Sequence, residues 1–175
     1  MNDSVKQLPF HFESIAKLNA PAETIFSHLV DHQRLSAHMS QSSWMMAGAH
    51  MNIELDAAQG HALGSKIRLS GRVLGIPLVV EEAVTDYAPP LRKSWLTTDE
   101  PKLLVIGHYR MGFEIAPQGN VSQLRIFIDY ALPEYFPERW LGRIFGSWYA
   151  RWCTLKMVKD AEKFFEANNH SVTKG

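Results

Sequence analysis

Residues 109–130 read YRMGFEIAPQGNVSQLRIFIDY, and this stretch decides how the chain folds. Apolar and polar side chains alternate on both sides of Gly119-Asn120, which is the period of half-buried β-strands. A Gly-Asn pair between two such runs favours a hairpin with a two-residue turn. The stretch therefore predicts an antiparallel hairpin in which Gln118 pairs with Val121.

The two-residue turn fixes a register that suits both faces of this hairpin. On one face, Arg110 lies opposite Asp129 and Glu114 opposite Arg125, so opposite charges meet. A four-residue loop would put Arg110 opposite Phe127, which makes the tight turn the better prediction. On the other face, the register pairs apolar and aromatic side chains: Ile115 with Leu124, Phe113 with Ile126, Met111 with Ile128, and Tyr109 with Tyr130.

A long helical pattern follows from Pro137 to about Ala167. At about 100° per residue it carries two apolar stripes on roughly opposite sides. One stripe begins with small side chains and reaches the C-terminal end: Gly146, Ala150, Cys153, Met157, Ala161, Phe164 and Phe165. The other holds large side chains and ends earlier: Leu141, Ile144, Phe145, Trp148, Trp152 and Leu155.

Gly146 and Ala150 give the helix little side-chain volume where it would face the sheet. Glycine costs a helix about 1 kcal/mol relative to alanine, so its presence needs a reason. Two explanations remain open. The small residues allow close packing of the helix on the sheet, or they keep a cavity open for a ligand.

The chain before the hairpin changes period twice. Residues 10–16 alternate like a strand. Pro21 suits the first turn of a short helix, and Asp31 suits the cap of a second one that carries Leu35 and Met39. Strand-like alternation, divided by turn residues at hairpin spacing, then fills the chain up to the hairpin. One strand, two short helices, five or six strands and one long helix predict an α+β protein with an antiparallel sheet.

Length and composition exclude several classes of protein. The 175 residues suit a single domain, which we place at residues 8–167, with a frayed C-terminal tail at 168–175. Lysine and arginine number 18, as do aspartate and glutamate, and this balance argues against nucleic-acid binding. With one cysteine and no apolar run of the length of a signal peptide or membrane span, we expect a cytoplasmic protein.

No cluster of residues matches a catalytic or metal-binding motif. His28 and His32 stand four residues apart, a spacing that can hold a metal, but no third ligand is implied. We interpret both as surface residues. Cys153 has no recognisable base, and we interpret it as a small buried apolar residue. We expect neither a metal nor a cofactor.

Three segments carry a resemblance to a known family. They are residues 19–26 (NAPAETIF), residues 84–95 (VTDYAPPLRKSW) and residues 149–153 (YARWC). The first resembles the "APAETVF" start of the START/Bet v 1-like superfamily (SRPBCC, or polyketide cyclase/dehydrase family). The second is similar to its "V…PP-R…W" passage, and the third to the final helix of one bacterial branch. The resemblance, from about Phe10 to Phe165, implies a helix-grip fold: six or seven strands wrapped around the last helix, with two short helices after the first strand.

The resemblance also implies an apolar cavity between the sheet and the last helix. Members of this family bind lipids, quinones or polyketide-like molecules there, and we favour a non-enzymatic binding protein because no catalytic motif is present. The alternative is a cyclase- or dehydratase-type enzyme acting on a polyketide-like substrate, for which Tyr109, Tyr130 and Tyr87 are the inward titratable groups. We expect the ligand to contact Tyr109, Met111, Phe113, Ile126, Ile128, Tyr130, Gly146 and Ala150.

The aromatic stripe of the long helix lies opposite the small residues, so the sheet cannot bury both. Another surface must shield the aromatic side chains from water. An exposed patch with two tryptophans is larger than a soluble monomer normally carries. We therefore expect a homodimer or a peripheral membrane contact through Phe145, Trp148 and Trp152, which would make the chain an interaction module. In the alternative, the helix is rotated, the aromatic residues fill the cavity, and the glycines face solvent or a loop.

Overall fold

The computed structural model describes residues 7–31, 51–73 and 76–172. The elements, in chain order, are β1 (Phe10–Leu18), α1 (Ala22–Leu29), β2 (Met51–Leu55), β3 (Lys66–Val73), β4 (Ile76–Ala88), β5 (Arg92–Thr97), β6 (Tyr109–Gln118), β7 (Val121–Tyr130) and α3 (Glu138–Val172). The second short helix predicted near Leu35 and Met39 lies outside the described residues. None of the helices in the described ranges is long and apolar enough to cross a bilayer.

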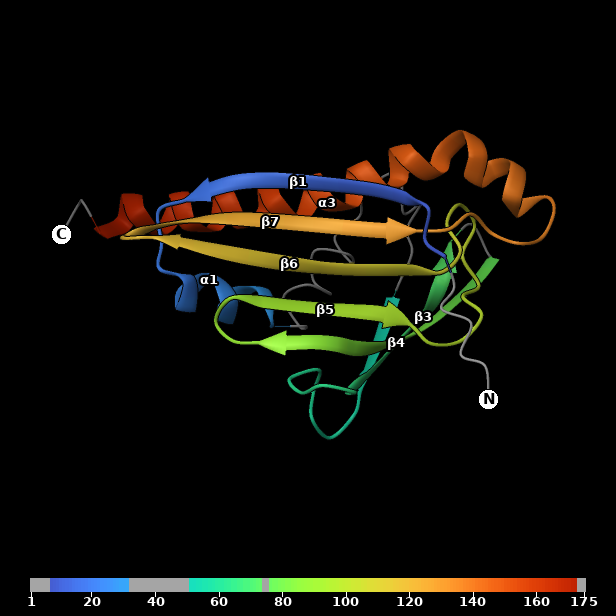
Figure 1. The fold of residues 1–175 in the computed structure, drawn as a ribbon, viewed down its shortest axis with the longest axis horizontal. Helices are drawn as coiled ribbons and strands as arrows, with labels where there is room; N and C mark the ends of the chain where they lie inside the picture. The colour runs from blue at the N-terminus through green and yellow to red at the C-terminus, as the bar shows by residue number, and fades with distance from the viewer. Residues whose placement is uncertain (1–6, 32–50, 74–75, 173–175) are drawn as a thin grey trace.

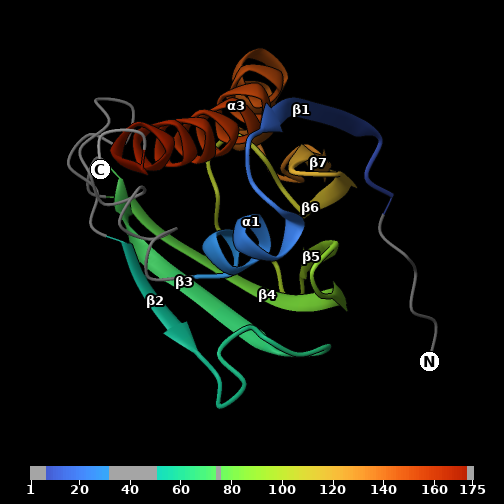
Figure 2. The ribbon, with the colours of Figure 1, turned by 90° about the vertical axis from the view of Figure 1, so that its left-hand side faces the viewer.

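The seven strands form one antiparallel sheet in the order β1-β7-β6-β5-β4-β3-β2. Figure 1 shows α3 running along β1 and β7, and Figure 2 shows the sheet curving so that α1 and α3 lie on its concave side. A curved sheet around a long C-terminal helix is the predicted helix-grip arrangement. α3 continues to Val172, past the boundary predicted at residue 167.

The β6–β7 hairpin has the predicted register. Gln118 pairs with Val121, and Gly119 in the turn between them has a φ of 71°, a conformation that glycine adopts without steric cost. On the convex face Glu114 lies opposite Arg125, and their side chains form an ion pair at 2.9 Å.

The second predicted ion pair of this hairpin is replaced by contacts to other residues. Arg110 lies opposite Asp129, as predicted, but its guanidinium stands 5.4 Å from the centre of the Phe127 ring. Asp129 instead forms a hydrogen bond of 2.6 Å with the imidazole of His11 on β1. β7 has β1 on one side and β6 on the other, so a charged side chain of β7 can pair with a residue of either strand.

α3 packs on the concave face through a stripe that differs in part from the predicted one. The hydroxyl groups of Thr154 and Ser14 share a buried hydrogen bond of 2.9 Å, which ties α3 to β1. Cys153 and Met157, which belong to the predicted stripe, are only half-buried beside the core. The buried stripe contains Ala150, Thr154, Val158, Ala161 and Phe165.

The beginning of α3 lies very close to the chain that precedes β6. A Cβ atom added at Gly142 would lie 2.8 Å from the carbonyl oxygen of Val105, and one added at Gly146 would lie 3.1 Å from the same atom. Both distances are shorter than an ordinary van der Waals contact. The structure therefore supports close packing as the explanation for Gly146.

Gly112 on β6 is covered by an aromatic ring from the neighbouring strand. Phe127 is its cross-strand partner, and a Cβ at Gly112 would lie 2.9 Å from the Cζ atom of that ring and 2.7 Å from the carbonyl oxygen of Lys93. The guanidinium groups of Arg110 and Arg125 lie over the same ring, at 5.4 and 5.1 Å from its centre. Because Gly112 has no side chain, the Phe127 ring can lie across it on the convex face.

We expect Gly112→Ala to lower the free energy of unfolding by about 1–3 kcal/mol, because the added methyl group overpacks the space under Phe127. Urea denaturation followed by circular dichroism would measure this loss. Ala116→Ser, at an exposed position on the same face of β6, is the control and should change stability by less than about 0.5 kcal/mol. An unchanged midpoint for Gly112→Ala would contradict the packing of Phe127 across this glycine.

Candidate functional site

One row of inward-facing residues crosses the whole concave face of the sheet, with one residue from each strand. Strand pairing connects most neighbours in the row, and the amide of Tyr109 donates a hydrogen bond of 3.2 Å to the hydroxyl of Thr97. The row is apolar at both ends and polar in the middle. From β2 to β1 it contains Leu55, Ile67, Glu82, Thr97, Tyr109, Tyr130 and Phe10.

The carboxyl group of Glu82 is the polar centre of this row. The residue is only 4% exposed, and its carboxylate accepts hydrogen bonds from the Tyr109 hydroxyl and from the Trp95 side chain. Burial disfavours the charged form more strongly than these donors and the nearby Lys93 favour it. The pKa of Glu82 is therefore raised to about 7, and both protonation states are populated near neutral pH.

Lys93 on β5 shares this interior with Glu82. It is 1% exposed, although lysine is rarely buried so completely. Burial lowers the pKa of Lys93 to about 8, and the negative charge of Glu82 limits the decrease. The ammonium nitrogen lies 5.9 Å from the centre of the Trp95 ring, a cation–π arrangement.

α3 contributes Tyr149 and Cys153 to the same interior. The Tyr149 hydroxyl hydrogen-bonds the sulfur of Cys153, but burial dominates and raises the pKa of the thiol to about 12. The thiol stays protonated at neutral pH and is not poised as a nucleophile. Cys153 and then burial raise the pKa of Tyr149, and Glu82 raises it further, so the groups on α3 and on the sheet lie within electrostatic reach. We call Glu82, Lys93, Trp95, Tyr109, Tyr149 and Cys153 the polar cluster.

A chain of hydrogen-bonding groups leads toward the surface from Thr97, which pairs with Glu82 across β4 and β5. The hydroxyl of Thr97 forms a hydrogen bond of 3.0 Å with Nδ1 of His108. Nε2 of His108 lies 3.3 Å from the carboxylate of Glu100, which is exposed whereas the histidine is buried. The interior is therefore connected to solvent through polar groups.

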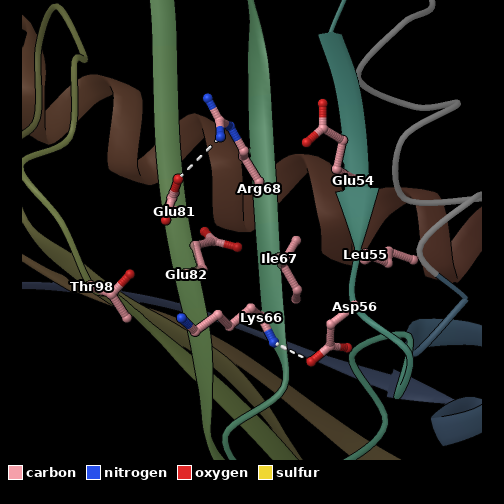
Figure 3. Close-up of a pocket in the computed structure, with 9 residues that line it drawn as sticks. All are labelled: Glu54, Leu55, Asp56, Lys66, Ile67, Arg68, Glu81, Glu82 and Thr98. Carbon is pink, nitrogen blue, oxygen red and sulfur yellow. Dashed lines mark hydrogen bonds and ion pairs between the residues drawn. The ribbon is translucent and has the colours of Figure 1, made fainter.

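An open groove of about 240 Å³ lies along β2, β3 and β4, and Glu82 is one of its walls. Figure 3 shows Glu82 beside Ile67, with the Arg68–Glu81 ion pair on the same two strands. Glu82, although buried, therefore lines a groove that is open to the surface. The residues that line it are Glu54, Leu55, Asp56, Lys66, Ile67, Arg68, Glu81, Glu82 and Thr98.

The six strand residues predicted to contact a ligand are all buried on the concave face, but they have different neighbours. Tyr109 belongs to the polar cluster. Phe113 packs edge-on against Phe26 of α1, at 5.6 Å between ring centres, and Tyr130 stacks on Phe10 at 5.3 Å. The other three are Met111, Ile126 and Ile128.

The two predicted helix residues lie in tightly packed parts of α3. A Cβ at Gly146 would lie 3.5 Å from the Tyr130 ring, so these two predicted residues are neighbours, and Ala150 is fully buried. Contact of all eight predicted residues with a ligand stays a prediction. His28, interpreted above as a surface residue, is half-buried and stacks on Phe164 at 4.0 Å between ring centres, and His32 lies outside the described residues.

Glu82, Lys93 and Tyr149 are absent from the residues predicted from sequence. A signal for two of them exists, since Lys93 has the same strand parity as Trp95, and Glu82 the same parity as Val84. A charged side chain on an otherwise apolar strand face is expected to be buried. Because buried charges are rare, such a residue indicates a candidate functional group. For Tyr149 the helical pattern offers no comparable signal.

No family model and no curated protein matches the sequence. Solved structures do match it. TTHA0849 from Thermus thermophilus has a TM-score of 0.64 at 13% identity, over 91% of this chain and 99% of that one. Norcoclaurine synthase from Thalictrum flavum, in complex with dopamine and hydroxybenzaldehyde, has a TM-score of 0.60 at 14% identity, over 89% and 85%. Zhui aromatase/cyclase from a Streptomyces has a TM-score of 0.59 at 14% identity, over 88% and 94%.

At such low identities these likenesses concern the fold. They agree with the observed order of strands and helices, and the chain has the helix-grip fold.

The raised pKa of Glu82 makes the stability of the protein depend on pH. The unfolded chain releases this proton near pH 4.5, whereas the folded chain keeps it up to about pH 7. The folded state binds more protons in this window, so the free energy of unfolding falls as the pH rises through it. We expect Glu82→Gln, measured by urea denaturation, to gain about 2–3 kcal/mol relative to wild type between pH 5 and pH 8.

Glu81→Gln is the matched control for this prediction, because Glu81 is the next residue of β4 and lies in an ion pair with Arg68. It should leave the pH dependence of wild type unchanged. If wild type and Glu82→Gln lose stability in parallel between pH 5 and pH 8, Glu82 does not hold its proton in the folded state.

Proposed function

We propose that this protein binds a hydrophobic small molecule between the sheet and α3, and that the polar cluster orients it. The observation that carries the proposal is a carboxyl group and an ammonium group, both buried, on a concave face that is mostly apolar. Binding sites for small molecules typically combine an apolar wall with a few such convergent polar groups.

The helix side of the interior supports this proposal. Tyr149, Cys153 and Met157 follow one another at intervals of one turn, and all three pack beside the core yet keep part of their surface accessible. A ligand against this stripe would lie between α3 and the polar residues of the sheet. Apolar burial would supply most of its affinity, at about 25 cal/mol per Å² before the costs of association.

The polar cluster favours a ligand that carries at least one oxygen atom. Lys93 is mostly charged at pH 7 and can only donate hydrogen bonds, whereas Glu82 donates when protonated and accepts when ionised. A phenol or a ketone offers the complementary group. Among proteins of this fold, one has been observed with dopamine and hydroxybenzaldehyde and another is an aromatase/cyclase, and both point to aromatic or polyketide-like molecules.

Acid–base catalysis on such a ligand is the second function that we propose, and the pKa values of Glu82 and Lys93 favour it. Groups that titrate near the working pH transfer protons efficiently. The carboxylate of Glu82 would take a proton from a carbon next to a ketone. The C–H electron pair would shift toward the carbonyl oxygen, and Lys93 would stabilise the negative charge on that oxygen by donating a hydrogen bond. The enolate carbon would then attack a second carbonyl carbon of the same chain and form the C–C bond that cyclisation requires. The alkoxide formed there would take the proton back from Glu82, which returns to its ionised state.

We expect 2-naphthol, an apolar aromatic molecule with one hydroxyl group, to bind with a measurable heat in titration calorimetry. Cys153→Phe should weaken this binding at least tenfold, because the added ring takes up space between α3 and the polar residues of the sheet, Glu82, Lys93 and Tyr109. Trp148→Ser, on the exposed side of the same helix, is the control and should bind like wild type. Unchanged binding by a folded Cys153→Phe variant would contradict a site on this stripe.

Catalysis has its own test, which uses a linear poly-β-ketone and follows the absorbance of the aromatic product. If the protein cyclises it, Glu82→Gln should reduce turnover about 10²-fold or more while the dissociation constant stays within a few-fold. No turnover by wild type, together with normal binding of 2-naphthol, would leave the binding function and remove the catalytic one.

A further inference from the structure

Two rows of side chains run next to each other along α3, and all but Trp152 are exposed. The first, which we call the aromatic row, contains Trp140, Ile144, Trp148 and Trp152 at intervals of four residues. Trp140 is 57% and Trp148 50% exposed, which is unusual for such large apolar side chains. The second, the arginine row, precedes each of these positions by one residue: Arg139, Arg143, Ser147 and Arg151, all of them exposed.

The charge of this helical segment has one sign. No aspartate or glutamate occurs from Arg139 to Lys159, and the first acidic residue after it, Asp160, is paired with Lys156 at 3.0 Å. Glu134 and Glu138 precede the rows, and Glu138 lies in the first turn of α3, where the helix dipole favours a negative charge. The charged members of the arginine row are all positive. The two rows together are therefore complementary to a surface in which a negatively charged layer covers an apolar one.

The position of the rows in the fold makes them accessible. Figure 1 shows the beginning of α3, in orange, extending beyond the end of the sheet at one extremity of the molecule. The segment that leads into it adds two aromatic side chains to the same extremity, Tyr135 and Phe136, and Phe136 is 84% exposed. A projecting end with exposed aromatic residues is suited to insertion into a broad, deformable surface.

A second copy of the chain fits these rows less well. Closed dimers usually use the same patch on both partners, so a twofold contact through this face would bring arginine rows together. No acidic residue occurs between Arg139 and Lys159, and Glu134, which lines one groove with Arg139 and Arg143, cannot balance three arginines. Like charges at an interface are unfavourable. A bilayer with anionic headgroups removes this conflict. Tryptophan and tyrosine favour the interface of a membrane with water, and arginine reaches from there to the phosphates.

We infer that the first turns of α3, with Tyr135 and Phe136, bind peripherally to the surface of an anionic phospholipid bilayer. The aromatic row enters the interfacial region and the arginine row contacts lipid phosphates. The inference does not depend on the ligand of the interior, since Trp140, Ile144, Trp148 and the arginine row are exposed, and only Trp152 is half-buried.

The test is flotation of the full-length protein with vesicles of phosphatidylcholine alone or with about one third phosphatidylglycerol. Wild type should float with the anionic vesicles at low salt, at least tenfold less with neutral vesicles, and less as salt is raised. Replacing Arg139, Arg143 and Arg151 with glutamine should weaken binding by about fivefold for each arginine. Trp140→Ser combined with Trp148→Ser should weaken it at least tenfold.

The charge-matched control replaces Lys17, Arg72 and Lys102, three exposed cations outside α3, with glutamine. It should bind like wild type, and circular dichroism would verify that every variant is folded. Equal flotation of the control and the arginine variant would overturn the inference, as would failure of wild type to float. Sedimentation showing a dimer that Trp148→Glu dissociates would also overturn it, because a second copy would then occupy the rows.

Discussion

The turn at Gly119-Asn120 sets the register on which the interior of this protein depends. Successive side chains of a strand point to opposite faces, so a shift of one residue would exchange the inward and outward sets of β6 and β7. The observed register turns Tyr109 inward, where its hydroxyl reaches Glu82 two strands away. It also turns Arg125 outward, where it holds Glu114 and Glu13 on the convex face. The two-residue turn therefore decides the geometry of both faces.

The elements that the sequence predicts well are those whose partners are close along the chain. The hairpin register follows from alternation and a turn, and the long helix from its period. Contacts between distant segments are harder. β4 carries an irregularity between Val84 and Asp86, after which Tyr87 rather than Asp86 is level with Lys93. Strict alternation misses this change of parity. Likewise, nothing within the hairpin shows that β1 brings His11 to Asp129.

The rotation of α3 has a similar cause. A pattern built on apolar residues passes over Thr154, yet its hydroxyl is buried against Ser14, and this bond lies at the centre of the buried stripe. Tyr149 and Cys153 are thereby turned toward Glu82. Burying the charges of Glu82 and Lys93 costs more than an apolar pair of the same size would, since desolvation exceeds their mutual attraction. A fold that needed only stability would gain from replacing both, which is why the polar cluster supports a role in recognition or catalysis.

The cross-strand row offers a way to redesign the interior. Each strand contributes one residue to it, and neighbouring strands lie about 4.8 Å apart, so the row divides the concave face into regular steps. Introducing a hydroxyl at Ile67 while removing the one at Thr97 would move the polar segment toward β3 without touching a turn or an ion pair of the convex face. Comparing the affinities of a series of such variants for one molecule would show at which strand its oxygen atom binds.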